Sequence, residues 1–185
     1  MKPGLWRWAW MLAGAGLFHG LAQAEPSLVI VVRHAERAPG AGGDPGLSAE
    51  GQQRAQALAE RLAASGLSGI VTTQYLRTQE TVQPAARRFG LQAQVVAARR
   101  GEAAAHVPEV LAAIRRMTGV VLVVGHSNTV ADIVAGLSGK RPLPLLPLCE
   151  TSHSHLFVVA PQPTAPALLH FNYGAADPPA QAGCQ

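Results

Sequence analysis

Two polar segments, each following a short run of apolar residues, constrain the fold more than any other feature of this sequence. Residues 27–32 are almost all apolar and lead into the segment RHAERAP at residues 33–39. Residues 120–124 are entirely apolar and lead into GHSN at residues 125–128. Such runs are typical of strands buried on both faces of a parallel sheet. Because loops at the carboxyl ends of parallel strands line ligand crevices, we expect the two polar segments to meet at one site.

Apolar runs alternate with helical patterns from Ser27 to Leu137, which predicts strands joined by helical crossovers. Near the end of the chain, two further strands are expected, separated by a proline-rich link that allows antiparallel pairing. The sequence therefore predicts an α/β fold: a three-layer α/β/α sandwich with a mostly parallel central sheet and the site at the carboxyl ends of its strands. The expected strands are residues 28–32, 69–73, 94–96, 120–124, 155–159 and 168–172.

Four helices are expected between these strands. Ser48 is predicted to cap the first, which ends near Gly66, and the second runs towards Phe89. The third spans residues 107–117, and the fourth is predicted to begin at a cap formed by Ser127 or Asn128 and to reach Leu137.

The first 24 residues have the composition of a cleavable signal peptide. Lys2 and Arg7 precede an apolar stretch that is shorter than a membrane-spanning helix needs, and Ala22-Gln23-Ala24 fits a cleavage site. We therefore expect a mature domain over residues 25–174, an irregular tail over 175–185, and no stable membrane anchor after cleavage. The expected location is periplasmic or secreted.

Charge and cysteine usage set further bounds. The chain has 15 basic and 11 acidic residues, and removal of Lys2 and Arg7 would leave a small positive excess. The basic residues form no continuous run. Nucleic-acid binding is therefore not expected. The two cysteines, Cys149 and Cys184, either form a disulfide in an exported protein or are two unpaired thiols. The sequence does not decide between these states, nor does it give the oligomeric state.

The polar segments contain the groups needed for phosphoryl transfer through a histidine. His34, presented at a strand end, is the candidate nucleophile, and its second ring nitrogen needs a backbone carbonyl that fixes the tautomer. Guanidinium groups are well suited to the charge on phosphoryl oxygens, and a histidine near a helix N-terminus can add a hydrogen bond. The candidate phosphate-binding residues are Arg33, Arg37, Arg77 and His126.

Taken in order, four motifs resemble those of the histidine phosphatase superfamily, in particular its branch of phosphoglycerate mutase-like and phosphohistidine phosphatase-like proteins. RHAERAP is similar to the family signature RHGxRxP, and LSxxG from Leu47, TxxxRTxxT from Thr73 and VGHS from Val124 follow it. The resemblance implies a nucleophilic His34, a phosphate pocket of Arg33, Arg77 and His126, and neither a metal ion nor another cofactor. Arg37 stands where the acid-phosphatase branch has its third arginine.

The sequence departs from the family pattern at two places. Ala35 replaces the usual glycine, a harmless change if its backbone lies in a common region. Ser127 follows His126 where the acid-phosphatase branch has an aspartate, so that proton donor is missing. Glu102 is the best positional counterpart of the mutase-like branch's glutamate, although a solvated loop carboxylate is an equal alternative. Glu109 falls inside a helix, and Glu36 is expected to order its loop.

The remaining histidines and Tyr75 have less specific interpretations. His153 and His155 are spaced to share one face of a strand and to chelate a metal, but no carboxylate or cysteine cluster completes a site, so surface or rim histidines are favoured. His106 and His170 have no visible partner in the sequence. Tyr75 is expected either to line the pocket or to pack.

These observations favour an exported phosphomonoesterase that acts on a small phosphorylated substrate, for which a cell-envelope sugar phosphate is one candidate. A phosphoglycerate mutase-like phosphotransferase is the enzymatic alternative. A non-catalytic phosphate-binding envelope protein is an alternative of a different class, and it would keep the arginine cluster without needing His34 for binding.

Overall fold

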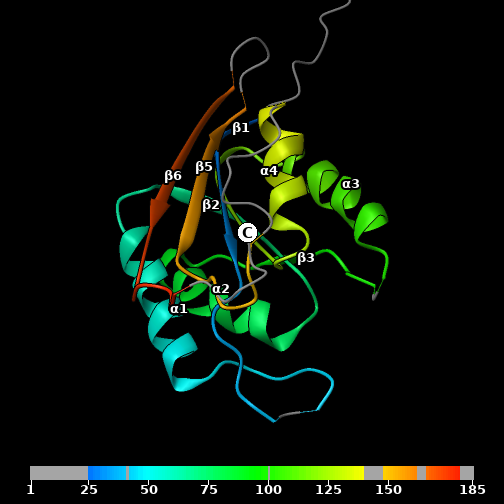
Figure 1. Ribbon diagram of the computed structural model, residues 1–185. Coiled ribbons are helices and arrows are strands. Elements are labelled where there is room, and N and C mark those ends of the chain that lie inside the picture. Colours follow the sequence, from blue (N-terminus) through cyan, green and yellow to red (C-terminus); the bar gives the residue numbers. More distant parts are fainter. Residues whose placement is uncertain (1–24, 41, 100, 140–147, 162–165, 180–185) are drawn as a thin grey trace, which may run out of the picture.

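The computed structural model describes residues 25–40, 42–99, 101–139, 148–161 and 166–179. These residues form one six-stranded sheet with strand order β3-β2-β4-β1-β5-β6 and four helices (Figure 1). The strands are β1 (Pro26–Arg33), β2 (Leu67–Thr72), β3 (Gln94–Val95), β4 (Gly119–Gly125), β5 (His155–Ala160) and β6 (Ala167–Asn172). The helices are α1 (Ala49–Arg61), α2 (Leu76–Phe89), α3 (Ala103–Ile114) and α4 (Val130–Ser138).

The sheet is parallel on one side and antiparallel on the other. β1 to β4 form parallel pairs, with β4 between β1 and β2. β5 runs antiparallel to β1, and β6 runs antiparallel to β5. The predicted α/β sandwich with a mostly parallel sheet is therefore confirmed, and so is the antiparallel pair at the end of the chain.

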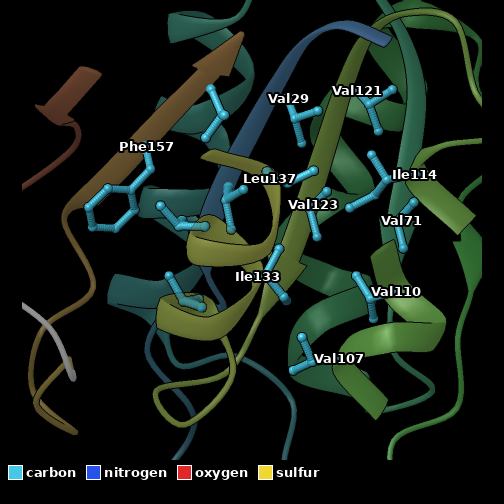
Figure 2. Close-up of a cluster of buried hydrophobic side chains, with 14 of the residues drawn as sticks. Val29, Val71, Val107, Val110, Ile114, Val121, Val123, Ile133, Leu137 and Phe157 are labelled. Carbon is cyan, nitrogen blue, oxygen red and sulfur yellow. The ribbon is translucent and has the colours of Figure 1, made fainter. Parts of the chain in front are cut away.

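Alternating side chains of the central strands face two separate cores, as expected for strands covered on both sides. Val29 and Val31 of β1 pack with the apolar sides of α3 and α4, together with Phe157 of β5 (Figure 2). Ile30 and Val32 point the other way, into a core completed by α1 and α2. The long apolar runs in the sequence reflect this double burial, which makes the carboxyl ends of β1 and β4 rigid platforms.

Three helices differ from the predictions at their boundaries, and one of them, α3, spans Ala103–Ile114 and not residues 107–117. α1 begins after Ser48, whose hydroxyl accepts a hydrogen bond from the Gly51 amide as predicted, but it ends at Arg61 and not near Gly66. α4 is preceded by Thr129, so the prediction that Ser127 or Asn128 caps it is wrong. The Thr129 hydroxyl accepts a hydrogen bond from the His126 amide at 3.0 Å and so fixes the turn that presents His126.

Several predictions concern residues outside the described ranges. The signal peptide over residues 1–24 and the proline-rich connection over 140–147 lie there, as does Cys184, the proposed partner of Cys149. Within the described residues, no helix has the length and apolar character needed to cross a bilayer.

Candidate active site

The register of β1 and β4 places the two polar segments side by side. Arg33 pairs with Gly125 at the carboxyl ends of the two strands, so the residues that follow them, His34 and His126, leave the sheet as neighbours. The His34 amide donates a hydrogen bond to the Gly125 carbonyl at 3.0 Å, and the two imidazole rings lie 5.4 Å apart between centroids. The expected meeting of the two segments is confirmed.

His34 is held in one tautomer by its own backbone. Its Nδ1 lies 2.7 Å from the carbonyl oxygen of Ala35, which can only accept, so Nδ1 carries the proton and Nε2 has a free lone pair. Burial, reinforced by the charge of Arg33 and opposed by the Ala35 carbonyl, lowers the pKa of His34 to about 2. The imidazole is therefore neutral at physiological pH and has the form that a nucleophile needs.

His126 is held in the opposite tautomer. Its Nε2 lies 3.2 Å from the hydroxyl of Thr73, which in turn lies 2.9 Å from the hydroxyl of Thr78. Thr78 donates to the carbonyl of Tyr75, so the chain of hydrogen bonds is completed if His126 donates from Nε2. Nδ1 then accepts from the Arg77 guanidinium at 3.5 Å, a group that can only donate. Burial and the charge of Arg77 lower the pKa of His126 to about 4.

Arg77 lies in the first turn of α2 and is held from three sides. Besides His126, it contacts the carboxylate of Asp44 at 3.5 Å and lies over the ring of Tyr75 at 4.3 Å from its centroid. Asp44 also accepts the Leu76 amide at the start of α2, which ties the loop after β1 to this helix. A guanidinium fixed in this way, with its charge only partly neutralised, is suited to an anion.

Arg33 is fully buried, and its guanidinium reaches across to the segment that precedes β5. It donates to the carbonyls of Cys149 and Ser152, at 2.5 and 3.2 Å, and to the carboxylate of Glu150 at 2.8 Å. Its Nε has no hydrogen-bond partner among the described residues. Arg33 is thus a buried positive charge that is paired with the Glu150 carboxylate.

His34, His126 and Arg77 line a cavity of about 420 Å³ at the carboxyl ends of the strands, whereas Arg33 is not among the lining residues. The cavity is rich in cationic and aromatic side chains, because Arg37, Arg77 and Arg99 line it together with Tyr75. Its remaining lining residues are His34, Ala98, Gly101, Ala103, His106, His126, Ser127, Asn128, Thr129 and Glu150. Among the described residues, no group of three or more His, Cys, Asp or Glu is arranged to hold a metal ion. The cavity can bind an anion between arginines with the His34 imidazole in its wall.

The comparisons with known proteins agree with this fold. Residues 29–100 match the model of the histidine phosphatase superfamily, branch 1. Over this segment, which is less than half of the chain, the sequence is similar to that superfamily. A segment of 53 residues is also 51% identical to the PE-PGRS family protein PE_PGRS11 of Mycobacterium tuberculosis, where the match covers 28% of this chain but 9% of that protein.

Solved histidine phosphatases have the same fold. The protein histidine phosphatase SixA in complex with tungstate aligns with a TM-score of 0.60 at 19% identity, over 78% of this chain and 96% of that one. The putative phosphohistidine phosphatase SixA from Agrobacterium tumefaciens gives 0.58 at 23% identity, over 83% and 100%. A mycobacterial glucosyl-3-phosphoglycerate phosphatase gives 0.54 at 17% identity, over 81% and 99%.

The two departures from the histidine phosphatase signature have different outcomes. Ala35 is fully buried and its φ is not positive, so a side chain is tolerated where relatives have glycine. Its amide donates to the Thr81 hydroxyl at 2.9 Å, which fixes the turn after His34. At the second departure, Ser127 donates to Glu150, a residue that the sequence motifs do not include.

Glu102 does not line the cavity. It lies at the start of α3 with its side chain about half exposed, and its carboxylate contacts Arg99 at 3.4 Å. The structure therefore places His34, Arg37, Arg77 and His126 on the cavity wall, buries Arg33 against the segment before β5, and leaves Glu102 off the wall. The prediction that Glu102 protonates the leaving group stays a prediction without support from this geometry.

Glu36 orders the loop after His34, as expected. Its carboxylate receives two hydrogen bonds from the buried Arg54 of α1, from Nε at 2.9 Å and from Nη2 at 2.7 Å. Burial alone would raise the pKa of Glu36, but the Arg54 hydrogen bonds outweigh it and the pKa is lowered. Gly51 is required here because a Cβ would lie 2.1 Å from the Glu36 carbonyl oxygen. The glutamate is thus a structural partner of α1.

His153 is buried behind the nucleophile, so the expectation of a surface or rim histidine is wrong for this residue. Its Nδ1 donates to the carbonyl of His34 at 2.9 Å, and its own amide donates to Asp177 at 2.8 Å. The described part of the tail, residues 175–179, is irregular as predicted but is anchored through Asp177. No local sequence pattern predicts this contact, because residues 34 and 153 are distant in the chain.

Of the remaining residues with less specific interpretations, two lie at the cavity and two lie away from it. His106 is buried at the cavity wall, where its Nδ1 lies 3.2 Å from the Ala97 carbonyl, and Tyr75 packs edge-on against His126. His155 and His170 instead pair with each other at 2.9 Å between β5 and β6, away from the cavity.

Proposed function

We propose that this protein is a phosphomonoesterase that hydrolyses small phosphate esters through a covalent phosphohistidine on His34. The observation that carries the proposal is the fixed tautomer of His34: Nδ1 is bonded to the Ala35 carbonyl, and the ring lines an arginine-rich cavity. A neutral imidazole with a free Nε2, next to groups that bind phosphoryl oxygens, is the arrangement that nucleophilic phosphoryl transfer requires.

The reaction has two steps. Arg37, Arg77 and His126 hold the phosphate while the buried Arg33 adds positive charge nearby, Nε2 of His34 forms a bond to phosphorus, and the bond from phosphorus to the ester oxygen breaks. The leaving alcohol takes a proton. Water then attacks phosphorus, the P–N bond breaks with its electron pair returning to Nε2, and inorganic phosphate leaves. Splitting the hydrolysis in this way replaces one difficult step with two easier ones.

The match to the histidine phosphatase model and the similarity to solved phosphatases support a phosphatase over other functions. The structural relatives named above include a protein histidine phosphatase and a glucosyl-3-phosphoglycerate phosphatase. A cavity of about 420 Å³ is of the size that holds a small molecule, so a small phosphorylated compound is the proposed substrate. We include metal independence in the proposal, because the arginines and His126 supply the positive charge and hydrogen bonds that a metal ion supplies elsewhere.

The test is the hydrolysis of p-nitrophenyl phosphate by the chain from Glu25 onward. We expect turnover that is unchanged by EDTA, is inhibited by vanadate and is abolished in the His34→Ala variant. Loss of turnover in EDTA that zinc or magnesium restores would overturn metal independence. Phosphate binding without turnover in the wild type, retained in His34→Ala, would instead show a binding protein. Transfer of the phosphoryl group to an added alcohol in preference to water would show a phosphotransferase.

We also propose that the protein is exported, with residues 1–24 as a cleaved signal peptide. The support is the pattern of Lys2 and Arg7 before an apolar stretch and Ala22-Gln23-Ala24 before Glu25. The test is cell fractionation with N-terminal sequencing of the recovered protein. A mature N-terminus at Glu25 in the periplasmic or extracellular fraction is expected, and an intact Met1 in the cytoplasm would contradict export.

A further inference from the structure

The proposed reaction needs a group that gives a proton to the leaving oxygen and later takes one from water. Such a group must reach the reacting phosphate, so it must line the cavity. Among the described residues that line the cavity, Glu150 is the only carboxylic acid. It lies in the segment just before β5, far in sequence from both polar motifs.

The contacts of Glu150 place its carboxylate between the two catalytic segments. One oxygen, Oε2, accepts a hydrogen bond from Arg33, the residue before His34, at 2.8 Å. The other, Oε1, accepts one from Ser127, the residue after His126. The side chain is nevertheless 69% exposed, so it can exchange protons with solvent and meet a substrate entering the cavity.

The other protic side chains of the cavity are less suited to the task. His126 has its Nε2–H committed to Thr73, and its Nδ1 accepts from Arg77. The His106 Nδ1 faces the Ala97 carbonyl, and the Tyr75 hydroxyl lies 3.4 Å from the carbonyl of Ala98. Glu102 is not among the lining residues, and its carboxylate contacts Arg99. Glu150 is the one carboxyl group among the described lining residues, and its exposed side chain can exchange a proton with solvent, so it is the group best suited to this task.

We propose that Glu150 is the catalytic acid and base of this enzyme, an inference that rests on the proposed phosphatase function. In the first step its carboxyl group gives a proton to the ester oxygen as the P–O bond breaks. In the second step the resulting carboxylate takes a proton from the water that attacks phosphorus, and the P–N bond to His34 breaks. The proton returns to Glu150, so one cycle consumes water and the ester and leaves the enzyme unchanged.

The electrostatics of the site explain how Glu150 becomes protonated. Without ligand, burial would raise its pKa, but the hydrogen bond from Ser127 and the charge of Arg33, aided by Arg37 and His153, outweigh it, so the pKa is lowered. A bound phosphate draws on the same arginine charges and repels a second anion beside it. Phosphate binding therefore favours the protonated form of Glu150, at the point in the cycle where an acid is needed.

The test compares Glu150→Gln with wild type on two substrates that differ in their leaving group. Glutamine keeps the size and hydrogen-bonding reach of the side chain but is neither an acid nor a base. p-Nitrophenyl phosphate releases a weakly basic phenolate that needs little protonation, whereas glycerol 2-phosphate releases a strongly basic alkoxide. Glu102→Gln tests the competing assignment, Glu109→Gln on the exposed side of α3 is the matched control, and thermal unfolding checks that all variants fold.

We expect Glu150→Gln to lose roughly 10²–10⁴-fold in kcat/KM for glycerol 2-phosphate and less than about 10-fold for p-nitrophenyl phosphate. Quenched samples should also contain more acid-labile phosphohistidine than wild type, because the second step has lost its base. Equal losses on both substrates, no loss on either, or the selective loss appearing in Glu102→Gln would overturn the assignment. An inactive wild type would instead refute the proposed function, and the role of Glu150 would be refuted with it.

Discussion

His34 and His126 leave neighbouring strands at equivalent positions, yet they are held in opposite tautomers. His34 donates from Nδ1 to a backbone carbonyl one residue away, which leaves Nε2 free. His126 donates from Nε2 to Thr73 and turns Nδ1 towards Arg77. Both rings are buried and neutral, so neither burial nor position on the sheet distinguishes them. The hydrogen-bond partner of each ring decides which histidine attacks and which one assists.

The comparison also shows what fixes each ring. The nucleophile is held by the main chain, and its own carbonyl is bonded to His153, so its geometry depends on the folded loop. The assisting histidine is held by side chains, two threonines and an arginine, and its state can change when phosphate arrives. A dianion next to Nδ1 favours a second proton on this ring, which then becomes a donor to a phosphoryl oxygen.

Removal of the nucleophile should have the largest effect. We expect His34→Ala to lower kcat for p-nitrophenyl phosphate by roughly 10⁴-fold or more, because no other group in the cavity can form the covalent intermediate. Stopped-time assays with the purified variant measure this loss. His155→Ala, which removes an imidazole paired to His170 away from the cavity, is the control and should keep its activity. Residual turnover above a hundredth of wild type in His34→Ala would mean that the ring is not the nucleophile.

Removal of the assisting histidine should cost less. We expect His126→Ala to lower kcat by roughly 10²–10³-fold, the usual effect of deleting one donor to a developing negative charge. Phosphoenzyme should still form, because Nε2 of His34 is intact, and rapid-quench experiments can detect it. A variant that forms no phosphoenzyme at all would place His126 in the nucleophilic step and break the distinction between the two rings.

Both histidines should make the protein less stable as the pH falls. In the folded protein their pKa values are lowered to about 2 and about 4, so the unfolded chain binds more protons below its histidine pKa of about 6.5. This contribution to stability is complete above pH 6.5 and is lost as the pH falls, down to about 4 for His126 and about 2 for His34. Each ring adds a slope of about 1.4 kcal/mol per pH unit.

Urea unfolding of wild type and His126→Asn between pH 7 and pH 4.5 measures this slope. The free energy of unfolding should fall less steeply with decreasing pH in the variant. The slope should be smaller by about 1.4 kcal/mol per pH unit, the contribution of one bound proton. Parallel curves would show that His126 titrates alike in the folded and unfolded states, and would contradict its burial as a neutral ring.

The smallest effect should come from the threonine that orients His126. Thr73→Val removes the acceptor of Nε2 at nearly constant volume, and the loss of one hydrogen bond of about 1 kcal/mol should lower kcat/KM roughly 5-fold. Thr72→Val is a matched control, because the buried hydroxyl of Thr72 has no hydrogen-bond partner among the described residues. The Thr72 variant should be fully active and at least as stable as wild type. Equal losses in both variants would refute the orienting role of Thr73.

The sequence predicted the parts of this site that follow from a local sequence pattern. His34 and His126 were recognisable because each follows a buried strand, and the parallel register then places them together. Ser48 was recognisable as a helix cap for the same local reason. Contacts between distant segments left no such pattern: Glu150 and His153 reach the site from the segment before β5. Thr129 took the place of Ser127 and Asn128 before α4 because its hydroxyl accepts the His126 amide, a detail of turn geometry that composition does not specify.

The central claim is that Nε2 of His34 carries the phosphoryl group. It is tested most directly by NMR of the trapped phosphoenzyme, with ¹⁵N-labelled histidine and phosphorus coupling to identify the phosphorylated nitrogen. The account predicts one phosphohistidine, at Nε2 of His34, with Nδ1 still protonated and bonded to the Ala35 carbonyl. Phosphorylation at Nδ1 of His34, or on His126, would contradict it.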